Sequence, residues 1–568
     1  MNPAWFNLNP VDPAAAIAQL ETEGFVAYER DCPPVPFQLP FDWLCDPFRD
    51  RNWKLQLHAW RMLDGYMRSF DESATAHDSF AKCVAVIDDW TRSTVAEQRD
   101  NDFTWYDLAI ANRALKLARL AMAAPQLGHE SGMAWPITPL RRAMIERHLV
   151  ALRDPAKLTQ GNHGFYQLHG LMALNWAFPD IATDELCHDY ASTQLNRLLQ
   201  FQFSESGVHL EDAPWYHFFS ANGCRKIVSS PWWSGHVPPE ADALLVKAEV
   251  AKSWLVAPDH RCVPIGDSPD AVVPDDVDHL LERPHQSQGR FVGSRLDGYG
   301  IVRSLPDCAP EAGSYLLMQA GFHRHGHKHS DCLSFVWWEN GEYLLIDPGR
   351  YGYQPGAWRD CLMSTRSHNA VEIDGQDYER ALGHAYGSAL QAVEPVGGDA
   401  WSMVARHVHG ELNVDHERRL TYLPGRGLVV VDHLKNLEQG LRNFTLWWHP
   451  NAGHRLDGAL RQDGFTVDIG HGRRLVATFA VSAPEVVCAP LTFHGALEPR
   501  RHGWWSPGYL RVEPATVVGC PFHSDEDITV VTLFEIVAGD DSTTMAIARH
   551  DKGFKVSGWG EAPLIIGA

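Results

Sequence analysis

The chain lacks the features that mark membrane and exported proteins. No apolar run approaches the roughly 18 residues that a membrane-spanning helix needs. The start of the sequence has neither the basic region nor the apolar region of a signal peptide. We therefore expect a cytoplasmic protein without membrane insertion, whereas a periplasmic or secreted location would follow if a signal had been removed.

Paired cysteines and an excess of positive charge are also missing. The 11 cysteines are scattered without CxxC spacing, and an odd number in a chain of 568 residues favours reduced thiols over a disulfide framework. Lys and Arg number 49 against 71 Asp and Glu, which gives a formal net charge of -22. Nucleic acid and anionic membrane surfaces are therefore not expected as partners, and homo-oligomer formation stays open.

What the sequence does contain is, first, a helical pattern. Between about residues 40 and 260, apolar residues recur every three or four positions, punctuated by Pro, Gly and Asp. This pattern predicts helices at 53–70, 78–95, 102–120, 138–153, 163–178, 185–203 and 240–256. Many antiparallel helices of similar length suggest a toroid or bundle, and no close repeat supports a regular solenoid.

Short apolar runs bounded by Gly, Pro or Asn replace this pattern in the second half. They predict strands at 315–319, 333–338, 343–346, 370–373, 428–431, 444–448 and 528–534, which is typical of stacked antiparallel sheets. The stretch 264–297 is rich in Pro, Asp, Gly and Ser and indicates a linker or a long surface excursion. We expect an α+β multidomain protein with a helical domain at 1–285 and an antiparallel β-sandwich domain at 286–568. A separate C-terminal sheet subdomain from about residue 490 is an option.

The most specific chemical signal is a row of four histidines on alternate residues at 323–329. In extended backbone such side chains share one face, so several imidazoles can converge on one metal ion or one anionic substrate. Asn-Gly at 340–341 predicts a hairpin that would bring His329 near Asp347, and His368 begins a further strand. Two imidazoles and a carboxylate suit tetrahedral zinc with a bound water, although a polar strand end with only hydrogen-bonded histidines is the alternative.

Residues 327–335, 341–353 and 364–375 resemble the C-terminal region of heparinase II/III-like polysaccharide lyases, a group that includes exolytic alginate lyases. The resemblance implies an incomplete (α/α) toroid followed by antiparallel β-sheets, the same order that the periodicity predicts. It also implies that His329, Asp347 and His368 hold a zinc ion, whose role in that family is usually regarded as structural.

Two shorter matches to the family lie in the helical half. Residues 161–169 are similar to its Asn-His pair, and residues 211–217 are similar to the segment with its catalytic tyrosine. Alone, the asparagine is typical of a helix N-cap, and a tyrosine of this kind is typical of a packed aromatic. The resemblance implies the following catalytic residues: Asn162, His163, Tyr216, His327 and Tyr353. We expect the amide and the phenol of the helical half to face the histidine row across a shared groove.

Such residues suit β-elimination from a uronic acid. The enzyme must remove the weakly acidic C5 proton beside a carboxylate, whose negative charge opposes a carbanion. Asn162 can donate a hydrogen bond to that carboxylate, and His163 or His327 can add a donor or positive charge. Tyr216 can be the base if a partner assists it, since an unperturbed tyrosine titrates near about pH 10, and it can also protonate the departing oxygen.

Substrate binding and substrate class follow from the same segments. The candidate substrate-binding residues are Glu211, Trp215, His217 and Arg366. Ordinary salt bridges are expected for Arg350 and Arg359. Some relatives that act on sulfated glycans carry a glutamate where this chain has Tyr166, and dense Lys/Arg runs are missing. The expected partner is therefore an acidic, carboxylated polysaccharide or oligosaccharide, such as an alginate-like, glucuronan-like or capsular polymer, rather than heparin.

Three other functions fit parts of the sequence. A glycoside hydrolase could use Glu211 and Asp212 with water. A non-catalytic carbohydrate-binding protein could keep the same fold and use some of the 21 Trp as stacking platforms. A metal-dependent hydrolase could activate water at His329, Asp347 and His368. A double bond in the product would separate the lyase from both hydrolases.

Overall fold

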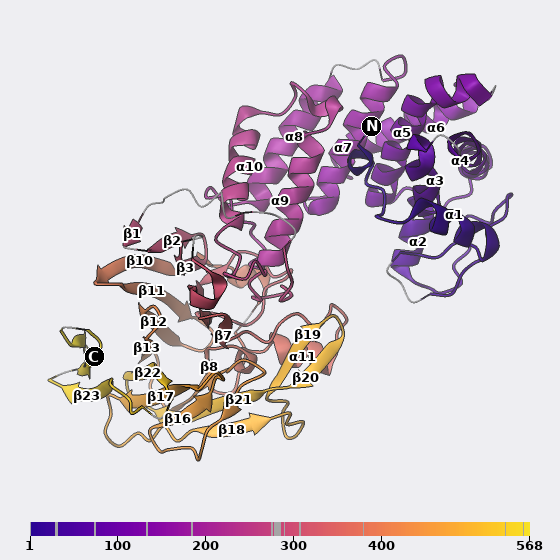
Figure 1. The fold of residues 1–568 in the computed structure, drawn as a ribbon. Coiled ribbons are helices and arrows are strands. Elements are labelled where there is room, and N and C mark those ends of the chain that lie inside the picture. Colours follow the sequence, from indigo (N-terminus) through magenta and orange to yellow (C-terminus); the bar gives the residue numbers. More distant parts are fainter. Residues whose placement is uncertain are drawn as a thin grey trace. The chain divides into compact units, whose positions relative to one another are not determined.

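The computed structural model of the chain describes residues 2–28, 32–72, 75–131, 135–182, 186–273, 277, 286–288, 290–305, 308–378, 380–539, 541–551, 553–560 and 562–567. The chain forms two compact units. The first comprises Met1–Gln202 and Ser220–Leu245, and the second comprises Phe203–Phe219 and Val246–Ala568. Segment 203–219 and the stretch after 246 therefore belong with the strand-rich unit. Figure 1 shows the helices of the first half in indigo to magenta and the strands of the second half in pink through orange to yellow.

Helices dominate the first half of the chain. They are α1 (Pro13–Thr22), α2 (Arg51–His58), α3 (Asp64–Arg68), α4 (Ala76–Thr91), α5 (Asp107–Ser131), α6 (Pro139–Arg153), α7 (Asn162–Ala177), α8 (Leu186–Gln202), α9 (Pro214–Val228) and α10 (Pro239–Lys252). Side chains at Asp12, Asp50 and Thr138 accept backbone N–H groups at the starts of α1, α2 and α6, as N-cap residues do. The first four N–H groups and the last four C=O groups of a helix have no partner within the helix, so caps at the first turn help to fix where these helices begin.

Most predicted helices are present, with two differences. The single helix predicted at 53–70 is interrupted, because Trp60 takes a left-handed backbone conformation (φ 56°) between α2 and α3. Helices α1 and α9 were not predicted. Close packing of α7 on α5 depends on a glycine: a Cβ at Gly170 would lie 3.0 Å from the carbonyl oxygen of Ala111. This close approach fixes α7, whose first residue is Asn162.

Two large antiparallel sheets build the second unit. The first is ordered β1 (Gln286–Gln288), β2 (Phe291–Leu296), β3 (Tyr299–Ser304), β4 (Ser314–Gln319), β6 (Phe335–Glu339) and β7 (Glu342–Leu345). The second is ordered β10 (Leu390–Gly397), β11 (Ala400–His409), β12 (Val414–Leu423), β13 (Gly427–Asn436), β22 (Ile528–Ala538), β17 (Arg473–Val481), β16 (Gly464–Asp468) and β15 (Arg455–Leu456). Every strand predicted from the sequence coincides with one of these strands or of those in the next paragraph.

Smaller sheets complete the unit. They are β18 (Leu491–His494), β21 (Thr516–Ser524), β14 (Arg442–Trp448) and β8 (Val371–Ile373); β5 (Gly321–Phe322) with β9 (Gly387–Ser388); β19 (Trp504–Gly508) with β20 (Arg511–Pro514); and β23 (Ala546–His550), β24 (Gly553–Ser557) and β25 (Leu564–Gly567). A short helix, α11 (Ala357–Met363), precedes β8. The strands after residue 490 do not form one separate subdomain, because β21 pairs with β14 and β22 lies between β13 and β17.

Alternation along the strands explains how the first sheet is buried on both faces. Val302, Leu316 and Trp337 belong to a core shared with the second sheet, where Trp337 packs against Phe534 with ring centroids 6.3 Å apart. Their strand neighbours, such as Leu317, pack instead into a core with the segment after α10. Side chains of successive strand residues point to opposite faces, so each strand feeds both cores.

The hairpin predicted from Asn-Gly is confirmed. Strands β6 and β7 pair with Glu339 opposite Glu342, and the two turn residues Asn340 and Gly341 both have positive φ (51° and 98°). Within the described residues, no helix has both the length and the apolar character required to cross a membrane.

The stretch expected as a linker is partly buried. Ile265, Asp267 and Ser268 are at most 1% exposed, so this part of 264–297 is an internal loop rather than a surface excursion. Pro, Gly and Asp mark turns, but they do not reveal whether the polar groups of a turn find partners inside the protein. Residues 274–276, 278–285 and 289 of that stretch lie outside the described residues.

Candidate active site

Tyr216 lies at the start of α9, in the part of that helix that belongs to the second unit. Pro214 is the first residue of the helix, a position where its fixed φ and missing N–H cost nothing. The Tyr216 hydroxyl lies 2.5 Å from the Tyr353 hydroxyl, and Arg350 donates a hydrogen bond of 3.1 Å to the Tyr353 oxygen. Burial, and then the hydrogen bond with Tyr353, raise the pKa of Tyr216 well above its ordinary value, so this phenol is protonated at neutral pH.

His327 stacks on the Tyr216 ring. The two rings are nearly parallel, at 12°, with centroids 3.4 Å apart. His327 Nδ1 lies 3.0 Å from Asp267 Oδ2, and its Nε2 lies 3.6 Å from Glu211 Oε2. An ionised carboxylate only accepts hydrogen bonds, so Nδ1 carries the proton and the lone pair of a neutral His327 is on Nε2. The phenol and a basic nitrogen therefore stand side by side.

Asp267 organises this part of the unit. Its fully buried carboxylate also lies 3.0 Å from His329 Nε2. It accepts hydrogen bonds from both terminal nitrogens of Arg359, with Nη2 at 2.8 Å. Burial alone would raise the pKa of Asp267, but the hydrogen bonds from His327, His329 and Arg359 hold it well below its usual range. The carboxylate is therefore ionised at any physiological pH.

A glycine allows the Asp267 loop to lie against the histidine segment. Gly266 has φ +56°, and a Cβ there would be 2.7 Å from the His327 carbonyl oxygen. That carbonyl accepts the backbone N–H of Asp267 at 3.0 Å. Any larger residue at 266 would thus push apart the two segments that bring Asp267 and His327 together.

Two carboxylates precede Tyr216. Burial raises the pKa of Glu211, and its Oε2 atom has no hydrogen-bond partner within the described part of the chain. Asp212 is buried, and its Oδ2 accepts a hydrogen bond of 2.8 Å from the backbone N–H of His323. Its Oδ1 lies 2.8 Å from His323 Nδ1. Glu211 is thus beside the stacked pair, whereas Asp212 holds the start of the histidine row.

The histidine row is not a strand. Regular β-structure ends at Phe322 and resumes at Phe335, and the row lies in the connection between β5 and β6. His327 and His329 both face Asp267, a carboxylate of the protein itself, whereas the alternation was predicted to bring imidazoles to a metal ion or an anionic substrate. His323 turns to Asp212, and His325 is exposed.

The three predicted metal ligands lie in one buried region, and Asp331 is a fourth potential ligand there. Asp331, Asp347 and His368 place ligand atoms within 4.8 Å of one another, and the rings of His329 and His368 are 5.3 Å apart. Asp347 Oδ2 faces His368 Nδ1 at 3.0 Å. Asp331, two residues after His329, was not among the predicted ligands.

The donor set fits a divalent metal ion. His329 and His368 each use one nitrogen on a carboxylate, which leaves the lone pair on the other nitrogen. Those nitrogens, His329 Nδ1 and His368 Nε2, are buried and have no hydrogen-bond partner among the described residues, as is also true of Asp331 Oδ2. Unpaired buried lone pairs of this kind are what a metal ion would satisfy.

Asn162 and His163 lie in the first unit, at the start of α7. Asn162 is not the N-cap, because Gly161 occupies that position; its Oδ1 accepts a hydrogen bond of 3.0 Å from Ser220 of α9. His163 Nδ1 lies 3.2 Å from Asp107 Oδ2, and its side chain is 41% exposed. Tyr166, on the same helix, is partly buried, and desolvation of its hydroxyl raises its pKa.

Three candidate substrate-binding residues do not join the stacked pair. His217 is buried, its Nδ1 accepts the backbone N–H of His209, its Nε2 contacts the Ala248 carbonyl, and burial lowers its pKa to about 3. Trp215 of α9 is partly buried and packs against the core that includes Phe218 and Trp254. Arg366 donates to the Arg501 carbonyl at 3.4 Å.

Arg350 and Arg359, expected to make ordinary salt bridges, are the arginines that contact the site. Arg359 does make an ion pair, but with the buried carboxylate of Asp267. Arg350 contacts Tyr353. The sequence around Asp267, Gly-Asp-Ser at 266–268, is typical of a turn. Such turns are too common for the sequence to identify Asp267 as a site residue.

The comparisons with known proteins agree with this architecture. The family model for the heparinase II/III N-terminus matches residues 21–268, and the model described as heparinase II/III-like, C-terminal, matches residues 296–534. No curated protein matches the sequence.

Solved structures share the fold at low identity. A heparinase III structure with methylated lysines has a TM-score of 0.75 at 15% identity, covering 100% of this chain and 92% of that one. A heparan sulfate lyase from Pedobacter heparinus has a TM-score of 0.73 at 13% identity, with 100% and 92% coverage. A xanthan lyase from Paenibacillus has a TM-score of 0.50 at 9% identity, with 98% and 61% coverage.

A helical region followed by antiparallel sheets, matched by both family models, is the architecture of a polysaccharide lyase. The predicted order of helices and sheets is confirmed. The chain belongs to the heparinase II/III-like family.

Proposed function

We propose that this protein is a lyase that cleaves uronic-acid-containing glycans by β-elimination. The observation that carries the proposal is the stack of a protonated phenol, Tyr216, on an imidazole whose other nitrogen is held by an ionised carboxylate. β-Elimination needs one group to take a proton and another to give one, and this pair offers both at one place.

In the proposed reaction, His327 Nε2 takes the C5 proton of the uronate. The electron pair of the C5–H bond forms the C4=C5 double bond, and the bond from C4 to the glycosidic oxygen breaks. Tyr216 protonates that departing oxygen. Asp267 stabilises the imidazolium that forms, as a carboxylate hydrogen-bonded to the far nitrogen of a histidine does. The raised pKa of Tyr216 favours the acid role over the base role for this residue.

Tyr353 and Arg350 support Tyr216 in this scheme. The Tyr353 hydroxyl is within 2.5 Å of the Tyr216 hydroxyl, and the Arg350 guanidinium donates to it. When Tyr216 gives up its proton, these two groups can stabilise the charge left on its oxygen.

Asn162 and His163 are proposed to neutralise the substrate carboxylate. The amide group of Asn162 offers donors that strengthen as negative charge moves from C5 onto the carboxylate, and His163 adds a donor or a positive charge. A metal ion held by Asp331, Asp347, His368 and His329 would supply rigidity to the segment that carries His327 rather than chemistry at the bond that breaks.

The proposed substrate class is a carboxylated polymer or its oligosaccharides. The net charge of -22 disfavours a densely sulfated chain, although one solved structure with this fold is called a heparan sulfate lyase. The decisive experiment is therefore a panel of alginate, glucuronan, capsular polysaccharide and heparan sulfate, monitored by ultraviolet absorbance of the unsaturated uronate and by mass spectrometry.

An unsaturated product from one of these polymers is the expected result, and Tyr216→Phe should lower its rate of formation by about 10²- to 10⁴-fold. Tyr28→Phe is a matched control, since Tyr28 is an exposed tyrosine of the first unit. A saturated product that contains oxygen from water would refute the lyase and support a hydrolase.

A further inference from the structure

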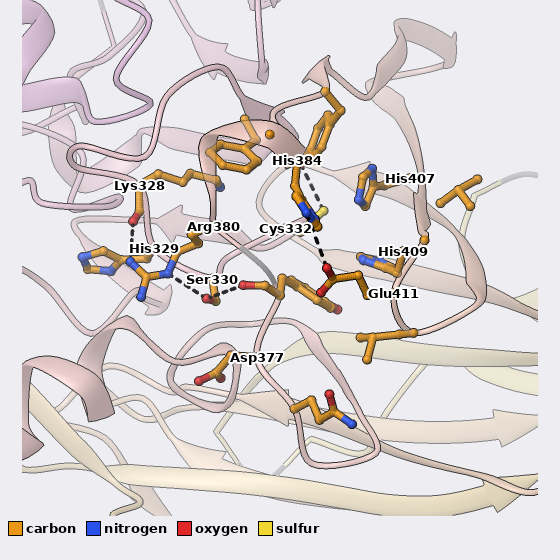
Figure 2. A pocket seen from close by; sticks show the side chains of 18 residues that line it. Lys328, His329, Ser330, Cys332, Asp377, Arg380, His384, His407, His409 and Glu411 are labelled. Carbon is orange, nitrogen blue, oxygen red and sulfur yellow. Dashed lines mark hydrogen bonds and ion pairs between the residues drawn. The ribbon is translucent and has the colours of Figure 1, made fainter.

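A second group of metal-ligating side chains lies elsewhere in the strand-rich unit. Cys332, His407 and His409, called the cysteine–histidine cluster from here on, place one ligand atom each within 4.8 Å of one another. They line a pocket with a volume of about 450 Å³. Figure 2 shows them around one end of this pocket, with Lys328 and His329 at the other end. None of the three takes part in the proposed elimination.

The fold explains why these residues meet. His407 and His409 are two residues apart on β11, so both side chains lie on the same face of the strand. The pairing of β11 with β10 ends at Ala405, so the strand end with both histidines has β12 on one side only. Cys332 comes from the connection before β6, immediately after the histidine row.

The polar atoms of the cluster are incompletely paired. His409 is 5% exposed, and its Nε2 has no hydrogen-bond partner within the described part of the chain. Its ring stacks on Tyr378 at 4.3 Å, which holds the imidazole in place. Cys332 Sγ is buried and lies 3.2 Å from the Tyr386 hydroxyl, which can donate a hydrogen bond to a thiolate. A buried nitrogen with a free lone pair beside a buried sulfur calls for a ligand.

We propose that Cys332, His407 and His409 bind a zinc ion, with the fourth position open to the pocket. One thiolate and two imidazoles form a soft and borderline donor set that suits zinc better than magnesium or calcium. Bond lengths of about 2.3 Å to sulfur and about 2.0 Å to nitrogen place tetrahedral ligand atoms roughly 3.3 to 3.6 Å apart. The three ligand atoms now lie within 4.8 Å of one another. Side-chain movements on the order of 1 Å would bring them to the distances that zinc needs.

The surroundings leave room for the ion and for a fourth ligand. His384 and Glu411 line the same pocket, with His384 Nε2 3.4 Å from Glu411 Oε1 and side chains 41% and 57% exposed. A water molecule or a carboxylate can therefore reach the open position from solvent.

Cobalt substitution tests the site without reference to lyase activity. The full chain is stripped of metal with a chelator and loaded with Co²⁺. A thiolate bound to Co²⁺ gives a charge-transfer band in the near ultraviolet, and the group at Asp331, Asp347 and His368 contains no sulfur. We expect the band in the wild-type chain, with one thiolate per chain, and competition of Zn²⁺ for it.

Variants assign the band to the cluster. Cys332→Ser and His407→Ala should abolish or strongly weaken it, with folding checked by circular dichroism. Cys262→Ser is the matched control, because Cys262 is another fully buried free thiol, and it should keep the band, as should His368→Ala. A loaded wild-type chain without the band, or a band that survives in Cys332→Ser, overturns the proposal. If Cys332→Ser does not fold, an unchanged band and affinity in His407→Ala overturns it.

Discussion

The ion pair between Asp267 and Arg359 allows a quantitative test of how the site is held together. The pair is buried: Asp267 is not exposed at all, and the Arg359 side chain is 10% exposed. Asp267→Asn removes the charge that compensates this guanidinium and turns one acceptor oxygen into an N–H donor. Arg359→Met removes the other partner and leaves the carboxylate with His327 and His329 only.

The expected magnitude follows from this burial. Removal of one partner from a buried pair costs about 3–5 kcal/mol, because the remaining charge stays uncompensated, whereas loss of both charges is close to neutral. Each single variant should therefore lose about 3 kcal/mol in the free energy of unfolding. The double variant should lose much less than the sum, which gives a coupling free energy of about 3 kcal/mol.

The assay is urea unfolding of the wild type and the three variants, followed by tryptophan fluorescence and near-ultraviolet circular dichroism. Asp270 and Arg261 provide the control cycle three residues further on, since their ion pair of 2.7 Å is 27% and 36% exposed. Such a partly exposed pair should give a coupling of only ~0–1 kcal/mol. Additive effects of Asp267→Asn and Arg359→Met would refute the view of Asp267 as the carboxylate that holds the site together.

The stability effect of Asp267→Asn should also depend on pH. The pKa of Asp267 is lowered in the folded protein, so its contribution to stability is fully present above the unfolded value of about 3.9. That contribution is lost as the pH falls through the folded pKa. The stability difference between wild type and Asp267→Asn should therefore be constant near neutral pH and shrink below about pH 4. A difference that grows in acid would contradict the assignment.

Three further outcomes are expected. Tyr216→Phe keeps the ring that stacks on His327, so the melting temperature should stay unchanged while kcat falls by about 10²- to 10⁴-fold; near-normal rates would remove Tyr216 from the mechanism. Asn162→Ala should lower kcat by roughly 10²- to 10³-fold with little change in KM, and a rise in KM alone would show that its bond is equally strong in the ground state. Chelation should lower the melting temperature and leave part of the activity, whereas complete loss of turnover in a folded protein would favour metal-dependent hydrolysis.

Periodicity predicted the fold more reliably than it predicted the turns. Apolar residues spaced over ten or more positions predicted α5 and α7, and Asn-Gly between two apolar runs predicted the β6–β7 hairpin. Both helices are buried on all sides over much of their length, at residues 109–120 and 167–175. The interruption at Trp60 depends on tertiary packing that overrides local propensity.

For the site, the sequence indicated residue types better than it indicated partners. The alternate histidines were predicted to share a metal ion or a substrate from extended backbone, whereas His327 and His329 lie in a loop and share Asp267 from a distant turn. Nothing local distinguishes Arg359 from Arg366, since only the fold decides which guanidinium meets a buried carboxylate. Contacts between segments far apart in the chain require coordinates.

The path of the chain through α9 matters for protein engineering. Residues 203–219 belong to the strand-rich unit but precede part of the helical one, so no single cut separates the two. A fragment that starts at residue 246 would keep His327 and Asp267 but lose Tyr216 and Glu211. Domain truncation, gene fusion or shuffling at that point would therefore yield an inactive half for reasons unrelated to its folding.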